Sequence, residues 1–167
     1  KGERPAWANS LCEDNAEFGL GMHIAVEKLR DRIEEKMRDA IANCSCCSDE
    51  LRKTMQEWID TRHSTLENHA VCERLIPMME ACGCDTCKEI LAMKDNLAKK
   101  SQWIFGGDGW AYDIGFGGLD HVLASGQDVN VLVVDTEVYS NTRGQSSKAT
   151  PLGAGAKFAS AGTLLRN

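Results

Sequence analysis

The stretch Gly-Gly-Asp-Gly-Trp at residues 106–110 lies between an apolar run and an amphipathic segment, and we expect it to decide the fold. Residues 102–105 before it are typical of a strand that runs into a tight turn, and Asp108 stands where the next helix should begin. Gly107 and Gly109 allow the backbone to approach a ligand closely. The free amides of a helix start favour phosphate. The motif therefore predicts a phosphate-binding turn between a strand and a helix.

The second decisive stretch is Val-Asn-Val-Leu-Val-Val at residues 129–134. It is short and β-branched, as expected of a parallel strand that is covered on both faces. It leads into residues 135–141 at the carboxyl edge of the sheet, where open α/β sheets bind ligands. The Asp108 carboxylate and polar groups of this second loop can hold Mg²⁺, which also binds phosphate oxygens. The two loops together predict an α/β fold with a magnesium–diphosphate site.

The same residues carry a family resemblance. Gly107-Asp108-Gly109 followed by Asn141 matches the signature of thiamine diphosphate enzymes. The longer string at residues 106–151, GGDGWAYDIGFGGLDHVLASGQDVNVLVVDTEVYSNTRGQSSKATP, resembles the pyruvate:ferredoxin (flavodoxin) oxidoreductases. So does PAWANSLCEDNAEFGLGM at residues 5–22, apart from a Cys in place of the usual Phe. Together with the helical region between these strings, the resemblance covers nearly the whole chain.

The resemblance implies a doubly wound parallel-sheet domain that binds thiamine diphosphate and carries an inserted helical bundle. It also implies a homodimeric, cytoplasmic enzyme that oxidises pyruvate to acetyl-CoA and CO2 and uses coenzyme A. Electrons would pass through [4Fe-4S] clusters to ferredoxin or flavodoxin. The family's cluster-binding cysteines match none of the eight cysteines here, and no part of the chain resembles the domain that activates the cofactor ring. We therefore expect part of a longer enzyme, inactive by itself.

The resemblance also assigns individual residues. Magnesium would be held by the Asp108 carboxylate, the Thr136 hydroxyl and the Val138 carbonyl, and Asn141 would lie near the thiazolium ring and the bound oxoacid. The remaining cofactor-binding positions are Gly107, Gly109 and Trp110. From the residues alone, the flanking glycines and the second loop favour Asp108 as a magnesium ligand over a plain helix cap. Asn141 suits a turn residue equally well.

Arg143 departs from the family, in which this position is usually Gly. If the backbone there has a positive φ, a side chain costs about 1–2 kcal/mol. This departure puts full activity in question, although the cationic side chain has the length to reach phosphates.

Composition excludes some functions and divides the chain. Nineteen basic residues against 25 acidic residues give a net charge of -6, which argues against a nucleic-acid partner. The absence of a long apolar run argues against a membrane span. All eight cysteines precede residue 100, whereas eleven of the fifteen glycines follow it. We predict a lead-in segment at 1–22, irregular over residues 1–21, a helical insert at 23–100 and a diphosphate- and magnesium-binding α/β part at 101–167. The last part should be truncated at its C-terminus and should contain a helix that begins near Leu152. The start at Lys1, with no signal-peptide pattern, predicts a piece of a longer cytosolic protein.

Four helices are expected in the insert, packed as an up-and-down bundle. Apolar residues repeat with a helical period across residues 23–42. Ser48 is a good cap for a second helix, and Pro77 should kink or end the third. Capping boxes indicate where the third and fourth helices begin: Ser64 with Glu67, and Thr86 with Glu89.

An up-and-down order brings two cysteine-bearing connections to the same end of the bundle. Six thiols would converge there: Cys44, Cys46, Cys47, Cys82, Cys84 and Cys87. Six thiols are enough for a tetrahedral zinc site or for disulfides. A reducing cytosol disfavours disulfides, and the irregular spacings C-x-C-C and C-x-C-x-x-C also suit free thiols.

Two alternative functions stay open. The first is an oxidoreductase for another 2-oxoacid, and the second is a non-catalytic, cysteine-rich module that binds a metal or a partner.

Overall fold

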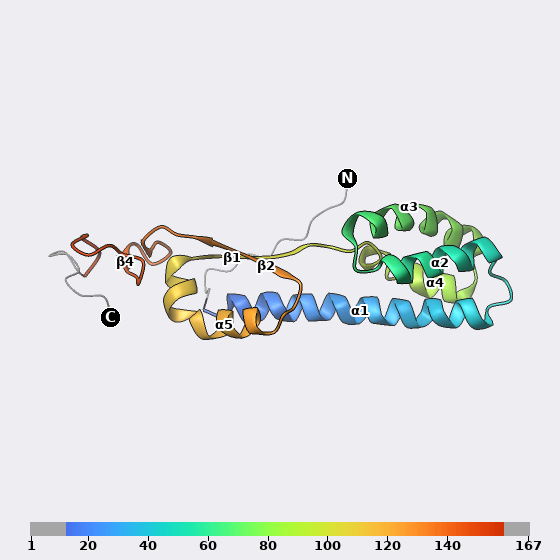
Figure 1. Cartoon of the computed structure of the whole chain (residues 1–167), viewed down its shortest axis with the longest axis horizontal. Coiled ribbons are helices and arrows are strands. Elements are labelled where there is room, and N and C mark those ends of the chain that lie inside the picture. The colour runs from blue at the N-terminus through green and yellow to red at the C-terminus, as the bar shows by residue number, and fades with distance from the viewer. Residues whose placement is uncertain (1–12, 159–167) are drawn as a thin grey trace. The chain divides into compact units, whose positions relative to one another are not determined.

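The computed structural model describes residues 13–158, which contain helices and a parallel sheet (Figure 1). The chain divides into two compact units. One unit combines the chain up to Met22 with the chain from Gln102 onward, and the other comprises His23–Ser101. The expected α/β class is confirmed in this coarse sense.

The helical unit holds most of the long helix α1 (Asn15–Asn43), followed by three shorter helices and a 3-10 turn: α2 (Asp49–Thr61), α3 (Thr65–Cys82), α4 (Asp85–Leu91) and Lys94–Asn96. Its core draws side chains from every one of these helices. Trp58 is fully buried there, and its Nε1 donates a hydrogen bond of 3.1 Å to the carbonyl of Leu97. The 3-10 segment is thereby held against α2.

A buried arginine joins separate parts of this unit. Arg30, on α1, donates hydrogen bonds to the carbonyls of Asn96 at 2.9 Å, Leu97 at 2.6 Å and Arg62 at 2.6 Å. Its guanidinium lies 5.2 Å from the centre of the Trp58 ring. These carbonyls stand where the helices have ended, so the arginine satisfies acceptors that lack an intrahelical donor.

The helix starts agree only in part with the predicted caps. Ser48 caps α2, because its side chain accepts a hydrogen bond of 3.2 Å from the amide of Leu51. Ser64 precedes α3 but makes no capping bond with its side chain. The box predicted at Thr86 and Glu89 is wrong. Helix α4 begins at Asp85, after the Cys84 sulfur, which accepts from the amide of Cys87 at 3.4 Å.

Pro77 was predicted to kink or to end α3. It does not end the helix, and it lies before the last turn. The helix continues to Cys82 and stops at Gly83, which has a left-handed φ of 61°. Leu75 and Met79, on either side of the proline, are fully buried. Their packing favours a continuous helix and offsets the hydrogen bond that a proline removes.

The α/β unit is built on two parallel strands, β1 (Gln102–Gly107) and β2 (Val129–Val134), which pair from Gln102 with Val129 to Gly107 with Val134. Between them run a π-helical turn (Trp110–Ile114) and α5 (Phe116–Ala124). Two short strands, β3 (Val138–Tyr139) and β4 (Gln145–Ser146), pair in antiparallel fashion after β2. The strand–turn–helix–strand order agrees with the prediction.

The lead-in was predicted to be irregular, and this is wrong for the residues that can be described. Residues 1–12 lie outside the described range, but α1 already begins at Asn15. Gly19 and Gly21 lie within this helix and do not interrupt it. A Cβ at Gly19 would stand only 2.5 Å from the Ile104 side chain on β1. The glycine therefore allows α1 to lie close against the strand.

Among the residues that the structure describes, the sheet is covered on one face, whereas β2 was predicted to be covered on both. Ala16, Trp110, Leu119 and Val122 pack with Ile104 on the covered face. On the other face, large apolar side chains stay exposed: Trp103, Phe105, Leu132 and Val134. The prediction failed because periodicity reports which residues are apolar but cannot supply a covering layer.

The end of the described chain also differs from expectation. A helix was predicted to begin near Leu152, but residues 151–158 form turns and one isolated bridge, between Lys157 and Gln145. None of the helices between residues 13 and 158 has the length and apolar character that a membrane span needs.

Candidate functional site

Asp108 lies at the carboxyl end of β1, where the chain turns into the helical segment. It is fully buried, which is uncommon for a carboxylate unless it is paired. Its Oδ1 accepts hydrogen bonds from the backbone amide of Thr136 at 3.0 Å and from the Thr136 hydroxyl at 3.1 Å. Its Oδ2 accepts from the Ser147 hydroxyl at 2.5 Å. The Asp108 carboxylate thus connects the loop after β1 with Thr136, in the loop after β2, and with Ser147, further along the chain.

These bonds outweigh the effect of burial on the carboxyl group. Burial by itself raises the pKa of Asp108, but the hydrogen bonds from Ser147 and Thr136 favour the charged form and hold the pKa below its ordinary value of 3.8. Asp108 therefore presents an ionised carboxylate at neutral pH.

Three oxygen atoms meet at Thr136. Its Oγ1 lies 3.1 Å from Asp108 Oδ1 and 3.1 Å from the carbonyl oxygen of Val138. Two oxygens at right angles around Mg²⁺, each about 2.0–2.1 Å from the ion, stand about 2.9 Å apart. A carboxylate, a hydroxyl and a carbonyl are also the hard ligands that this ion prefers. The types of oxygen ligand therefore suit magnesium, and so do the two distances from Thr136 Oγ1.

The glycines of the motif have different surroundings. A Cβ at Gly107 would meet only the carbonyl of Val134, at 3.9 Å, which leaves space beside the backbone. A Cβ at Gly109 would lie 2.6 Å from the Tyr139 ring. Packing against Tyr139 thus already requires a glycine at 109. Trp110 is a core residue of the α/β unit and is almost fully buried.

Asn141 and Arg143 lie in the exposed turn between β3 and β4. The turn closes through the amide of Gly144, which donates to the carbonyl of Tyr139 at 2.8 Å. Arg143 has a φ of 81°, the left-handed conformation in which glycine is favoured. The backbone at residue 143 therefore has the positive φ at which a side chain is strained.

A group of cysteine side chains gathers in the helical unit, at the connection from α1 to α2 and around the one from α3 to α4. The Cys44 sulfur lies 3.0 Å from that of Cys46, 3.1 Å from that of Cys47 and 3.9 Å from that of Cys84. Two sets of four sulfurs each lie within 4.8 Å of one another: Cys44, Cys46, Cys47 and Cys84, and Cys47, Cys82, Cys84 and Cys87. The predicted convergence of six thiols is confirmed.

Crowding gives these thiols unequal acidities. Hydrogen bonds from Cys46 and Cys47 lower the pKa of Cys44 to about 6. The hydrogen bond with Cys44 raises the pKa of Cys46 to about 12, and burial raises that of Cys87. Among Cys44, Cys46 and Cys47, the lowered pKa therefore favours the thiolate at Cys44, and the raised pKa values keep Cys46 and Cys47 protonated as its donors.

The comparisons with known proteins agree with the family resemblance. The chain is 54% identical to the pyruvate-flavodoxin oxidoreductase of Klebsiella pneumoniae and 48% identical to the pyruvate:ferredoxin oxidoreductase of Moorella thermoacetica, over 99% of its length in both cases. It is 45% identical, over 97% of its length, to the mitochondrial pyruvate dehydrogenase [NADP(+)] of Euglena gracilis. The resemblance to pyruvate:ferredoxin (flavodoxin) oxidoreductases is confirmed. The chain spans 14%, 15% and 9% of the length of these relatives, respectively. No family model matches the chain.

Some residues around Asp108 received no role from the sequence. Ser147 bonds to the carboxylate, and Thr150 accepts from the amide of Ser147 at 2.8 Å and donates to the carbonyl of Glu137 at 2.5 Å. Both lie in the string that resembles these oxidoreductases, but a hydroxyl far along the chain gives no spacing signal. Only the tertiary structure places Ser147 beside the GDG turn.

The cysteine spacing contains a clearer zinc signal than the sequence interpretation gave it. Cys44 and Cys47 form one C-x-x-C, and Cys84 and Cys87 form another. Paired C-x-x-C motifs are typical of zinc sites. The additional cysteines at 46 and 82 obscured this spacing.

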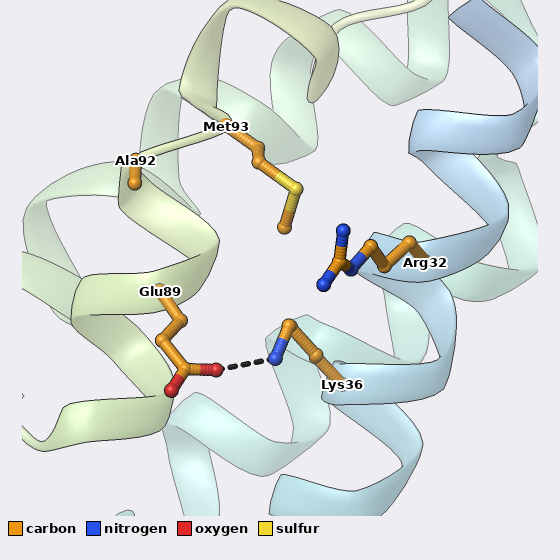
Figure 2. Close-up of a pocket in the computed structure, with 5 residues that line it drawn as sticks. All are labelled: Arg32, Lys36, Glu89, Ala92 and Met93. Carbon is orange, nitrogen blue, oxygen red and sulfur yellow. Dashed lines mark hydrogen bonds and ion pairs between the residues drawn. The ribbon is translucent and has the colours of Figure 1, made fainter. Parts of the chain in front are cut away.

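A surface hollow of the helical unit offers less. Figure 2 shows it between α1 and the end of α4, lined by Arg32, Lys36, Glu89, Ala92 and Met93. The hollow has two cationic side chains, Arg32 and Lys36. Lys36 forms an ion pair with Glu89, so its charge is already neutralised. An open hollow with one ion pair has the features of ordinary protein surface.

Proposed function

We propose that the chain supplies the magnesium–diphosphate anchor of a thiamine diphosphate-dependent oxidoreductase that acts on pyruvate. Identity of 45–54% along nearly the whole chain to relatives whose names specify pyruvate oxidation supports this. The single observation that carries the site is the meeting of three hard oxygen atoms at Thr136, 3.1 Å from Asp108 and 3.1 Å from Val138.

In this proposal Asp108, Thr136 and Val138 bind Mg²⁺, and the ion binds the diphosphate. The Thr136 amide and the Ser147 hydroxyl hold the Asp108 carboxylate in place and keep it ionised. The space beside Gly107 would allow the diphosphate to approach the backbone, and the exposed Asn141 would lie near the thiazolium ring of the cofactor. Thiamine diphosphate itself supplies the nucleophilic carbon and the electron sink.

The electron acceptor is decided outside this chain. The relatives' names specify flavodoxin, ferredoxin or NADP(+), although all three share this segment with 45–54% identity. We assign ferredoxin or flavodoxin as partner, together with coenzyme A and [4Fe-4S] clusters whose ligands are not among these eight cysteines. A homodimer in the cytoplasm completes the proposal. The alternative of another 2-oxoacid is tested by comparing 2-oxoglutarate with pyruvate as substrate.

A segment exchange tests the proposal directly. The matching segment of the Klebsiella pneumoniae enzyme is replaced by this chain, and pyruvate-dependent reduction of flavodoxin is measured. We expect the chimera to keep activity and to bind thiamine diphosphate in a magnesium-dependent manner. Asp108→Ala in the chimera should abolish this binding, because the hard charged ligand is lost.

Asp120→Asn is the matched control, since Asp120 is an exposed carboxylate on α5. It should leave both cofactor binding and activity unchanged. Calorimetric titration of the chimera with thiamine diphosphate, with and without Mg²⁺, measures the affinity. Equal affinity in the Asp108→Ala chimera and in its parent would contradict the site, and a folded chimera that binds the cofactor but does not oxidise pyruvate would contradict the activity.

The 167-residue chain by itself should bind magnesium and thiamine diphosphate weakly, because it contributes only the diphosphate half of the site. Titration of the isolated chain checks this. Tight, magnesium-dependent binding would mean that the chain holds the pyrimidine side of the cofactor as well.

A further inference from the structure

The two groups of cysteines in the helical unit overlap in a specific way. Each contains four sulfurs, and Cys47 and Cys84 belong to both. Cys44 and Cys46 belong only to the first group, and Cys82 and Cys87 only to the second. Two tetrahedral sites that share two ligands need six ligands in all, and six cysteines are present.

We propose that this cluster is a binuclear zinc centre in which the thiolates of Cys47 and Cys84 bridge the two ions. Cys44 and Cys46 complete the first site, and Cys82 and Cys87 complete the second. This inference does not depend on the proposed function, because it concerns the helical unit alone.

The spacing of the sulfurs favours single metal ions over an iron–sulfur cluster. Four sulfurs about 2.3 Å from a tetrahedral zinc ion stand about 3.8 Å apart. The sulfur of Cys44 lies 3.0 to 3.9 Å from those of Cys46, Cys47 and Cys84, and all the sulfurs of each group lie within 4.8 Å of one another. An iron–sulfur cluster carries inorganic sulfides between its irons, which would force the cysteine sulfurs further apart.

Two ions suit the cluster better than one. A single ion in either group would leave two thiols of the other group crowded beside bound thiolates. With two ions, all six sulfurs are ligands, and the two central sulfurs share their charge between both ions. Soft thiolate ligands in a tetrahedral arrangement favour zinc among the common divalent ions.

The surrounding structure holds the cluster in place. Arg52, on α2, donates to the carbonyls of Cys44 at 2.5 Å and Cys47 at 3.2 Å, which fixes the first connection and brings positive charge close to the thiolates. Cys47 and Cys87 are buried in the core of the helical unit. The amide of Cys87 donates to the sulfur of Cys84 at 3.4 Å.

The role that follows is a structural cross-link. One connection joins α1 to α2, and the other joins α3 to α4, so the metal centre ties all four helices together at one end. Binding free energy of a structural zinc site is folding free energy, because the unfolded chain lacks the preformed site. The centre should therefore stabilise the helical unit strongly.

Metal analysis tests the stoichiometry. The 167-residue chain is purified under reducing, anaerobic conditions with zinc supplied, and its bound zinc, iron, copper and acid-labile sulfide are measured. We expect two zinc ions per chain, with the six cluster thiols protected from a thiol reagent by the metal and the buried Cys72 protected by the fold alone. One zinc ion, no metal with the exposed Cys46 reactive, copper, or iron with sulfide would each overturn the proposal.

Cobalt tests the bridges. Co²⁺ replaces zinc in thiolate sites and carries unpaired electrons, and shared thiolates couple the spins of two neighbouring ions. The form with two Co²⁺ should show thiolate charge-transfer absorption for both ions but a spin-resonance signal smaller than twice that of one ion. A signal equal to two independent ions would exclude Cys47 and Cys84 as bridges.

Cysteine variants separate the site from the fold. Cys46→Ser changes an exposed thiol and should lower the zinc content while the helical circular dichroism remains. Cys84→Ser removes a bridge and should lower the content further. Cys72→Ser is the matched control, because Cys72 is a buried cysteine of the same unit outside both groups; it should keep two ions. Unchanged zinc in Cys46→Ser and Cys84→Ser would overturn the assignment.

Discussion

The helical unit and the α/β unit cover their apolar side chains to different degrees. In the helical unit, Trp58, Met55 and Leu75 are fully enclosed. In the α/β unit, Ile104 is buried on one face of β1, but its neighbours Trp103 and Phe105 are 50% and 58% exposed on the other. A helix bundle can close its own core, whereas a two-stranded sheet needs a layer on each side.

The two units therefore differ in the interactions that stabilise them. The helical unit adds polar links to a complete core, since Arg30 and Trp58 both bond to the carbonyl of Leu97. In the α/β unit, the carboxylate of Asp108 has that linking role for the loops. We expect core substitutions to act most strongly in the helical unit, and substitutions on the sheet to depend on the face.

The largest effect should come from Trp58→Ala. It removes a fully buried ring, its hydrogen bond to Leu97 and the contact with Arg30, so we expect the helical unit to lose about 3–5 kcal/mol of unfolding free energy. Urea denaturation followed by circular dichroism measures it. Leu66→Ala is the control, since Leu66 is 85% exposed, and should stay within about 0.5 kcal/mol. A small effect at Trp58 would mean that the helical core is loosely packed.

Two adjacent residues of β1, Ile104 and Phe105, lie on opposite faces of the sheet and allow the stability of each face to be measured separately. Ile104→Ala should destabilise the α/β unit by about 2–4 kcal/mol, because it opens a cavity in the covered face. Phe105→Ala, on the exposed face, should cost less than about 1 kcal/mol. Hydrogen exchange of the amides of β1 and β2 reports both variants separately from the helical unit. Equal losses would show that the second face is covered in solution.

Asp108→Asn should weaken the α/β unit by about 1.5–3 kcal/mol at neutral pH, since it removes a charged acceptor of three hydrogen bonds. The folded-state pKa of Asp108 lies below 3.8, so its contribution is complete above that pH and is lost as the pH falls through the folded-state value. Hydrogen exchange from about pH 5 to about pH 2 measures the difference. A difference between the two proteins that persists at the lowest pH would contradict this assignment.

The smallest effect is a gain. Arg143→Gly should stabilise the turn between β3 and β4 by about 1–2 kcal/mol, because φ at this position is 81° and glycine adopts it without strain. Exchange rates of the Gly144 amide, which bonds to Tyr139, report on this turn. Arg143→Ala is the matched control and should give no comparable gain, since alanine keeps the Cβ. Equal gains from Gly and Ala would locate the effect in the arginine charge.

Local chemistry determined a large part of this structure from the sequence alone. The strand before Gly107, the turn at Asp108, the strand at 129–134 and the cap at Ser48 depend on neighbours in the chain, so their patterns predict them. The family resemblance depends on long runs of residues in order and was equally accessible. The assignment of magnesium to Asp108, Thr136 and Val138 remains a prediction.

Other features were decided by contacts between distant parts of the chain. Gly19 lies within α1 and leaves room for the Ile104 side chain on β1. Ser147 donates a hydrogen bond to Asp108 because the folded sheet brings their two loops together. Helix α4 begins at Asp85, with Cys84 as its cap in place of the predicted capping box, because the Cys84 sulfur accepts the amide of Cys87 within the thiol cluster. One exposed sheet face followed from the lack of a covering layer within the described residues. Sequence patterns report the polarity and local conformation of each residue, but contacts across the chain arise only when the elements pack, and those contacts fixed the cysteine cluster and the surroundings of Asp108.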